Sequence, residues 1–170
     1  MVRQTKSTFA GLRAIALLLA VTFTAFLAVT PALANTPPRT FIVIDAASGQ
    51  VLFDEAPDLE IHPASLTKMM TLYLLFDALK SGRLKMSSRI KFSRKASRQT
   101  PSKLGVRAGR SISVRTAIPA LAIKSANDVA VAVAERLGRT EKRFAEKMNA
   151  KARALGMSRT NFVNASGLHD

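Results

Sequence analysis

Ser65 and Lys68 are the residues whose types and spacing best suit chemistry in this sequence. They lie at the start of an almost continuous apolar stretch, residues 66–79, which predicts a helix in the middle of a core. Residues three apart on a helix share one face, so the Lys68 amine can reach the Ser65 hydroxyl. A hydroxyl beside a group that can take its proton is the arrangement of an activated serine nucleophile.

Lys68 contradicts the usual rules for the first turn of a helix. A cation there opposes the helix dipole, and burial beside an apolar helix penalises an ammonium group. Both effects favour a neutral amine, which is the form that a general base requires. The competing interpretation of Ser65 is an ordinary N-cap after Pro63 and Ala64, but a cap alone does not explain Lys68.

Three other short motifs are less specific. Residues 125–127 (Ser-Ala-Asn) lie between two predicted helices, where a hydroxyl and an amide can point into one cleft. Taken alone, they are better explained by a helix–helix turn in which Ser125 or Asn127 caps the next helix. Residues 80–82 (Lys-Ser-Gly) follow a helical stretch, and we interpret them as a helix stop. Residues 88–91 repeat the Ser-x-x-Lys spacing without a buried helix after them.

The sequence closely resembles the D-alanyl-D-alanine carboxypeptidases, the low-molecular-weight penicillin-binding proteins, in three stretches that occur in the family's order. These are residues 63–70 (Pro-Ala-Ser-Leu-Thr-Lys-Met-Met), 125–128 (Ser-Ala-Asn-Asp) and 162–170 (Phe-Val-Asn-Ala-Ser-Gly-Leu-His-Asp). Their co-occurrence is far more specific than any single motif. The resemblance covers residues 40–170 and implies an α+β fold, the penicillin-binding or serine β-lactamase-like fold, in which an antiparallel sheet is flanked by a helical region.

The resemblance also implies roles for four residues. Ser65 is expected to attack the carbonyl between the two terminal D-alanines of a peptidoglycan stem peptide, while Lys68 takes the hydroxyl proton. Ser125 is expected to help pass a proton to the departing D-alanine, and Asn127 to orient Lys68 and the substrate amide. A β-lactam is expected to mimic the substrate and acylate Ser65. No cofactor is implied.

The sequence departs from the family pattern at two points. The middle residue of Ser-x-Asn is commonly Gly and is Ala126 here, a small change. The Lys-Thr-Gly strand, which is expected to hold the substrate carboxylate, belongs well downstream of Asp170. We therefore expect a chain truncated before the later strands of its fold, and residues 35–170 to be inactive alone.

Two other functions fit parts of the pattern. A class A β-lactamase shares the broad fold but usually has Ser-Asp-Asn where this chain has residues 125–127, and it needs an acid for deacylation. A non-catalytic exported protein that binds cell wall or an anionic surface is the second alternative. The family-like stretch at residues 160–170 favours the carboxypeptidase.

Residues 1–34 have the pattern of a secretory signal peptide. Three basic residues precede an uncharged stretch at residues 14–29, and Ala32-Leu33-Ala34 supplies a small-x-small cleavage site. Sixteen residues followed by Pro31 are short for a membrane span. We expect residues 35–39 to be a linker, residues 40–170 to be the N-terminal part of the catalytic domain, and the protein to be exported to the periplasm or the outer face of the cytoplasmic membrane.

The charge is strongly basic and unevenly spread. The formal net charge is +15, and thirteen Lys and Arg residues but no acid occur between Asp77 and Asp128. Such a stretch attracts anionic lipid or cell-wall polymer, and the competing interpretation is an ordinary solvated face. Nucleic acid is not an expected partner, because only Phe92 offers a stacking ring there. With no Cys and two His residues, neither a disulfide nor a metal site is expected.

Local patterns predict the remaining elements. A β-hairpin is expected over residues 40–54 with Gly49 in its turn, then a loop to Pro63. A short strand is expected at residues 89–93 and an exposed loop at residues 94–110. Three helices are expected in the second half, with Pro119 kinking or starting the first and Thr140 capping the last. They are residues 113–124, 128–137 and 141–155.

Overall fold

The computed structural model describes residues 39–168. The predicted signal peptide and all of the predicted linker except Arg39 lie outside the described residues, as do His169 and Asp170. The chain divides into two compact units, with the boundary between Pro57 and Asp58.

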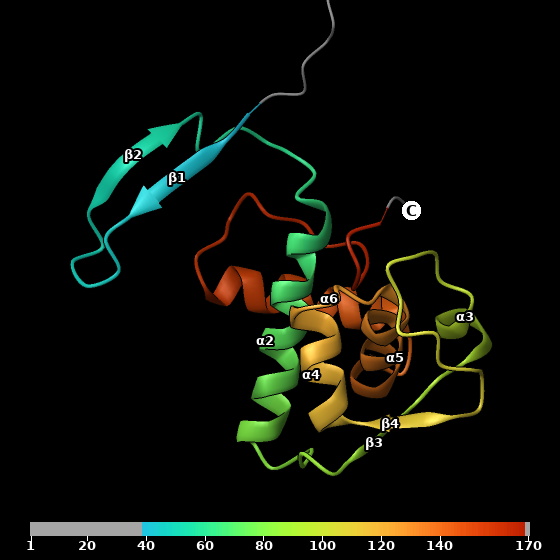
Figure 1. The fold of residues 1–170 in the computed structure, drawn as a ribbon. Coiled ribbons are helices and arrows are strands. Elements are labelled where there is room, and N and C mark those ends of the chain that lie inside the picture. Colours follow the sequence, from blue (N-terminus) through green and yellow to red (C-terminus); the bar gives the residue numbers. More distant parts are fainter. Residues whose placement is uncertain (1–38, 169–170) are drawn as a thin grey trace, which may run out of the picture. The chain divides into compact units, whose positions relative to one another are not determined.

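The first unit is a β-hairpin of β1 (Phe41–Ile44) and β2 (Val51–Glu55), as the sequence predicts (Figure 1). Gly49 adopts a φ of 74° in its turn, a conformation that glycine reaches without steric cost. The Asp45 carboxylate closes the turn by accepting hydrogen bonds from the Ser48 amide and hydroxyl, at 2.7 and 2.6 Å. These bonds lower the pKa of Asp45.

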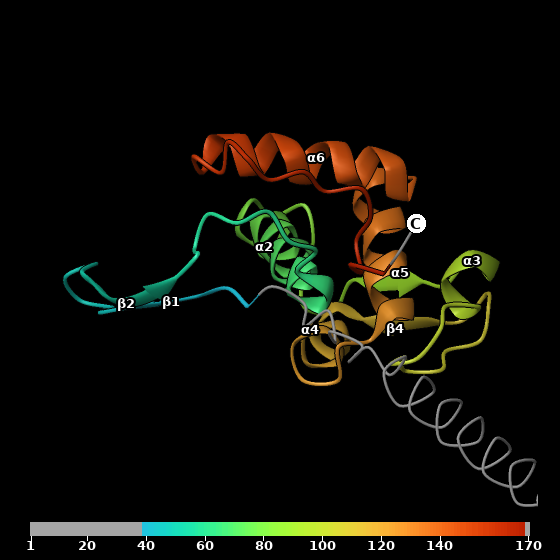
Figure 2. The same ribbon diagram turned by 90° about the horizontal axis from the view of Figure 1, so that it is seen from above.

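The second unit has a helical core. A 3-10 turn, η1 (Ala64–Leu66), leads into α2 (Thr67–Lys80), and α4 (Val114–Ala122), α5 (Asn127–Gly138) and α6 (Glu141–Ala154) complete the core. The helix α5 contacts α2, α4 and α6, and Figure 2 shows α6 crossing it. The corner between α5 and α6 is tight: a Cβ on Gly138 would lie 2.7 Å from the Phe144 backbone nitrogen.

The most deeply buried helix is α5 and not α2, which corrects the sequence-based expectation. Eight consecutive residues at the start of α5, all small or of medium size, are buried. In contrast, α2 leaves Met69, Tyr73 and Phe76 between 41% and 68% exposed on one face. An apolar sequence shows that a helix has surface to bury, but only the neighbouring elements decide which side is covered.

A short antiparallel ladder of β3 (Arg89–Lys91) and β4 (Ser111–Ser113) follows the C-terminal end of α2. The strand β3 is predicted correctly, whereas β4 lies where the helical pattern was expected to begin. The expected loop at residues 94–110 starts with one helical turn, α3 (Arg94–Ser97), capped by the Ser93 hydroxyl. The three residues of β4, two of them serines, carry too little apolar alternation for a pattern to reveal that strand.

Helix boundaries agree closely with the local signals. Pro119 lies inside α4 and does not start it. The Thr140 hydroxyl accepts a hydrogen bond from the Arg143 amide at 3.2 Å and so caps α6. Gly82 follows the end of α2 with a φ of 72°, which confirms residues 80–82 as a helix stop. The described chain therefore has an α+β fold of small antiparallel sheets and five α-helices.

Candidate active site

The structure brings Ser65 and Lys68 together at the start of α2. Ser65 is the middle residue of η1, and its hydroxyl oxygen lies 3.2 Å from the Lys68 amine. Neither η1 nor α2 has a side-chain cap, so the N-cap interpretation of Ser65 is wrong. Ser65 itself is exposed. An accessible hydroxyl within hydrogen-bonding distance of an amine has the geometry of a nucleophile and its base.

Lys68 is largely buried at the start of α2. Its side chain is only 3% exposed, and its amine donates a second hydrogen bond, of 2.8 Å, to the Ser166 carbonyl oxygen. Burial lowers the pKa of Lys68, because the charged form loses its hydration. A lower pKa increases the fraction of neutral amine, which has the lone pair that a general base needs.

The segment of residues 162–168 packs over the start of α2 and supplies the partner of Lys68. The Asn164 side chain shapes this segment by accepting hydrogen bonds from the Ser166 and Gly167 amides, at 3.1 and 2.7 Å. The Thr71 hydroxyl donates to the Ala165 carbonyl at 2.8 Å. Together these bonds fix the direction of the Ser166 carbonyl toward Lys68.

Gly167 allows the close approach of this segment to η1. A Cβ at this position would lie 1.8 Å from the Ala64 carbonyl oxygen, and the backbone has a φ of 78°. No other residue type fits such a contact. The family resemblance includes this segment but implies no site role for Asn164, Ser166 or Gly167. The sequence pattern that could have indicated this turn is the Asn-x-x-Gly spacing of Asn164 and Gly167, which is typical of turns supported by an Asn side chain.

Ser125 and Asn127 lie in the turn between α4 and α5. Ser125 adopts a φ of 53°, and its hydroxyl has no hydrogen-bond partner within residues 39–168. The N-cap of α5 is Ala126, without a side-chain cap, so neither Ser125 nor Asn127 has the capping role considered above. A partly exposed hydroxyl in a strained conformation is typical of a functional position.

Asn127 is engaged by a neighbouring loop and not by Lys68. Its side-chain amide donates to the Thr100 carbonyl at 3.0 Å, and its backbone N–H donates to the Ser102 carbonyl at 2.7 Å. The expected hydrogen bond between Asn127 and Lys68 is therefore not formed in this structure. The amide nitrogen uses one of its two N–H donors in this bond, and the Oδ1 atom of Asn127 is left for another donor.

Asp128 anchors the same loop, residues 100–106, through its side-chain carboxylate. It is fully buried, and its carboxylate accepts hydrogen bonds from the Leu104 and Gly105 amides, at 2.8 and 2.9 Å. It also accepts from the Val129 amide at the start of α5. A buried carboxylate is stable when backbone donors surround it. Asp128 thus holds the loop at residues 100–106 against the turn that carries Ser125, a role that sequence analysis missed.

The second Ser-x-x-Lys pair has a different geometry. The Ser88 hydroxyl accepts a hydrogen bond from the Lys85 amide at 2.8 Å, and Lys91 is an exposed residue of β3. This pair therefore lacks the buried amine of the first.

Residues 39–168 contain neither a candidate metal site nor a candidate membrane-spanning helix. No group of three or more His, Cys, Asp or Glu side chains could hold a metal ion. No described helix is both long and apolar enough to cross a membrane.

The fold and this site define a class, the penicillin-binding proteins. D-alanyl-D-alanine carboxypeptidase DacD from Francisella tularensis superposes with a TM-score of 0.76 at 34% sequence identity, over 84% of this chain and 34% of that one. Penicillin-binding protein D2 from Listeria monocytogenes, solved with ampicillin bound, gives a TM-score of 0.68 at 32% identity. This second match covers 77% of this chain and 52% of that one.

The sequence places the chain within that class. The profile of the peptidase S11 family, described as D-alanyl-D-alanine carboxypeptidase, matches residues 28–170, and the chain belongs to this family. D-alanyl-D-alanine carboxypeptidase DacF from Bacillus subtilis is 35% identical over 130 residues. That alignment covers 76% of this chain but only 33% of the relative, so the chain spans about a third of the curated protein that it matches.

Proposed function

We propose that this chain is the catalytic N-terminal part of a serine D-alanyl-D-alanine carboxypeptidase, with Ser65 as its nucleophile. The observation that carries the proposal is the 3.2 Å contact between the exposed Ser65 hydroxyl and the buried Lys68 amine. Within residues 39–168, the amine has the Ser65 hydroxyl and the Ser166 carbonyl oxygen as its hydrogen-bond partners. Its lowered pKa therefore suits it to take the hydroxyl proton.

The proposed reaction has two halves. The Ser65 oxygen attacks the carbonyl carbon between the two terminal D-alanines, Lys68 takes the hydroxyl proton, and the C–N bond breaks as the departing D-alanine amine receives a proton through Ser125. Water then attacks the acyl-enzyme and releases the shortened peptide. The Ser65 backbone N–H at the head of α2 suits one half of an oxyanion hole. Asn127 Oδ1 is available to accept a hydrogen bond from the substrate amide.

The proposed substrate is a peptidoglycan stem peptide that ends in D-alanyl-D-alanine, and β-lactams are the proposed inhibitors. The family description and the ampicillin-bound relative support this assignment. A strained β-lactam amide presents the same electrophilic carbonyl to Ser65, so it forms the first covalent bond by the same chemistry.

Covalent labelling by a fluorescent penicillin tests the proposal, with the protein expressed from its complete gene. Labelling is expected, and Ser65→Ala is expected to abolish it. Ser88→Ala is the matched control, because Ser88 also precedes a lysine by three residues but lies beside exposed Lys91. Labelling that survives Ser65→Ala would refute the assignment of the nucleophile.

The same experiment separates the alternatives. Slow release of the bound penicillin is the carboxypeptidase result, and rapid hydrolysis would indicate a β-lactamase. If the complete protein carries no label, a non-catalytic binding protein becomes the better explanation.

We also propose that the protein is exported to the periplasm or the outer face of the cytoplasmic membrane. The support is the pattern of residues 1–34, with its basic start, apolar stretch and Ala32-Leu33-Ala34 site. N-terminal sequencing of the protein recovered from cells is expected to begin at Asn35. A protein that retains Met1 and stays in the cytosol would contradict this proposal.

A further inference from the structure

The segment of residues 162–168 forms neither helix nor strand, so its amides find their acceptors largely on side chains. Ala165 is fully buried, and its amide donates a hydrogen bond of 3.2 Å to the Oε1 atom of Glu141. A buried amide without an acceptor is costly. Glu141 therefore supplies an acceptor that a regular element would supply from its own backbone.

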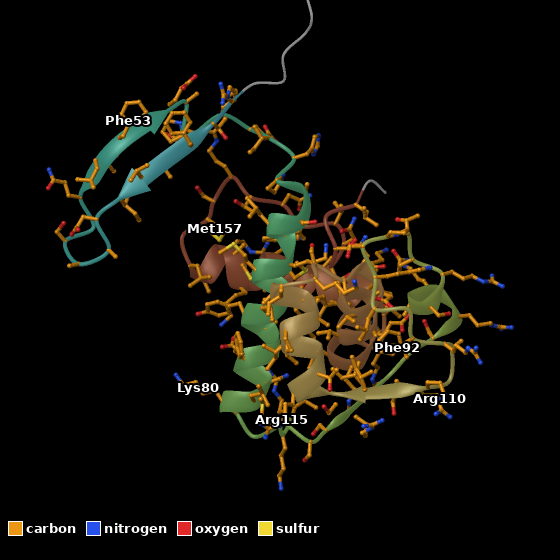
Figure 3. The ribbon with its side chains drawn as sticks, in the orientation of Figure 1. Phe53, Lys80, Phe92, Arg110, Arg115 and Met157 are labelled. Atoms are coloured by element: carbon orange, nitrogen blue, oxygen red, sulfur yellow. The ribbon has the colours of Figure 1, made fainter. Side chains whose placement is uncertain are left out.

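Glu141 holds this segment from the first residue of α6, and its side chain is only 11% exposed. After α6 the chain turns back at Met157, labelled in Figure 3, whose amide donates to the Ala152 carbonyl at 2.9 Å. The segment then runs back along the helix, with Phe162 bound to Asn149 and Ala165 bound to Glu141 (Figure 2). Residues 141 and 149 are about 12 Å apart along the helix, so α6 holds the segment at two separate points.

Two ordinary explanations of Glu141 depend on its charge. An acid in the first turn of a helix stabilises it through the helix dipole, and the Oε2 atom of Glu141 lies 2.6 Å from the Lys95 amine. The Lys95 side chain is 60% exposed, however, and ion pairs of such exposed groups contribute little to stability. Neither explanation accounts for the hydrogen bond that Oε1 accepts from Ala165.

Ala165 lies directly before the residue whose carbonyl binds Lys68. Its amide is held by Glu141, and its carbonyl accepts a hydrogen bond of 2.8 Å from the Thr71 hydroxyl. Because both backbone groups of Ala165 are held, the next carbonyl, that of Ser166, is directed at the Lys68 amine 2.8 Å away. The Glu141 carboxylate is thus connected to the Lys68 amine through two residues of the segment.

We propose that Glu141 is a positioning residue for the acylation step, acting through the segment that orients Lys68. By holding the Ala165 amide, its carboxylate fixes the direction of the Ser166 carbonyl that Lys68 binds. This inference rests on the proposed function of Ser65 and Lys68. The important feature of Glu141 is its Oε1 acceptor and not its charge. Without that acceptor the Ser166 carbonyl gains freedom, and the Lys68 amine spends less time directed at the Ser65 hydroxyl.

Two variants of nearly equal size separate the acceptor from the charge. Glu141→Gln and Glu141→Met both remove the charge and the ion pair with Lys95, but only glutamine keeps an oxygen that can accept from the Ala165 amide. Glu146→Met is the control, because Glu146 is an exposed residue of the same helix. The rate of labelling of the complete protein is measured over a range of fluorescent penicillin concentrations, which separates initial binding from acylation.

Glu141→Met is expected to slow acylation at saturating penicillin by about tenfold, while initial binding changes by less than about twofold. Glu141→Gln and Glu146→Met are expected to stay within about twofold of the wild-type acylation rate. Circular dichroism and urea unfolding show whether each variant is folded.

A wild-type acylation rate in Glu141→Met would overturn the proposal. Equal slowing of Glu141→Gln and Glu141→Met would also overturn it, because the charge would then be the cause. Failure of either variant to fold would assign Glu141 to stability alone, with the same consequence. The loss of labelling in Ser65→Ala tests the proposed function itself, so the two proposals can fail separately.

Discussion

At the scale of single residues, the surroundings of Lys68 determine whether its amine can accept a proton. The amine is buried in the first turn of α2, where the helix dipole and the loss of hydration both disfavour a positive charge. A neutral amine can donate to the Ser166 carbonyl and still direct its lone pair at the Ser65 hydroxyl. The geometry and the lowered pKa therefore support the same role.

The pH dependence of penicillin acylation is expected to follow the Lys68 pKa. A lowered pKa leaves more neutral amine at a given pH, so the rate should rise with pH and level off below the ordinary lysine value of 10.5. Lys68→Arg should be at least about 100-fold slower at every pH, because guanidinium stays protonated. Stopped-flow labelling measures this, with Lys91→Arg as the control. An unchanged profile in Lys68→Arg would exclude Lys68 as the base.

At the scale of elements, the segment of residues 162–168 decides how Lys68 is held. Two hydrogen bonds between the Asn149 side chain and the Phe162 backbone attach it to α6, at 2.6 and 2.8 Å. At its other end, Gly167 lies against η1. This segment therefore connects α6 to the start of α2, and a change in its position moves the carbonyl that Lys68 binds.

Gly167→Ala is expected to destabilise the protein and to slow labelling. Gly156→Ala is the matched control, because both glycines have a φ near +79° but nothing lies within 4 Å of a Cβ at Gly156. The control should cost about 1 kcal/mol from backbone strain. Gly167→Ala should cost roughly 2 kcal/mol more, because its methyl group overlaps the Ala64 carbonyl. Urea unfolding measures both, and equal losses would show that the close approach does not matter.

At the scale of the whole molecule, much apolar surface is uncovered within the described residues. Ile42, Val43, Leu52 and Phe53 are each about half exposed on the hairpin, and α2 exposes Met69, Tyr73 and Phe76. An isolated two-stranded hairpin buries too little area to be stable by itself. The chain spans about a third of the curated relative that it matches, so further elements of such proteins are available to cover such surfaces.

Residues 35–170 alone are expected to release no D-alanine from a peptide ending in D-alanyl-D-alanine. The Lys-Ser-Gly sequence at residues 80–82 is a helix stop, so it does not supply the Lys-Thr-Gly strand that the family resemblance implies for holding the substrate carboxylate. A coupled D-amino-acid oxidase assay measures release, with the product of the complete gene as the positive control. Turnover by residues 35–170 would show that this segment holds its substrate without that strand.

Local signals determined several elements of this fold without tertiary information. The Thr140 cap, the stop at Lys80 to Gly82 and the Gly49 turn each involve residues within a few positions of one another, so sequence patterns predict them correctly. The same holds for the Ser65–Lys68 contact, because helical periodicity alone brings residues three apart onto one face.

Only the tertiary structure decided what surrounds that pair. The carbonyl that binds Lys68 belongs to Ser166, 98 residues away, and the loop that occupies Asn127 is anchored by buried Asp128. Which face of α2 is covered depends in the same way on α4, α5 and α6. Such contacts depend on the path of the whole chain, whereas a local pattern carries information only about its own neighbours.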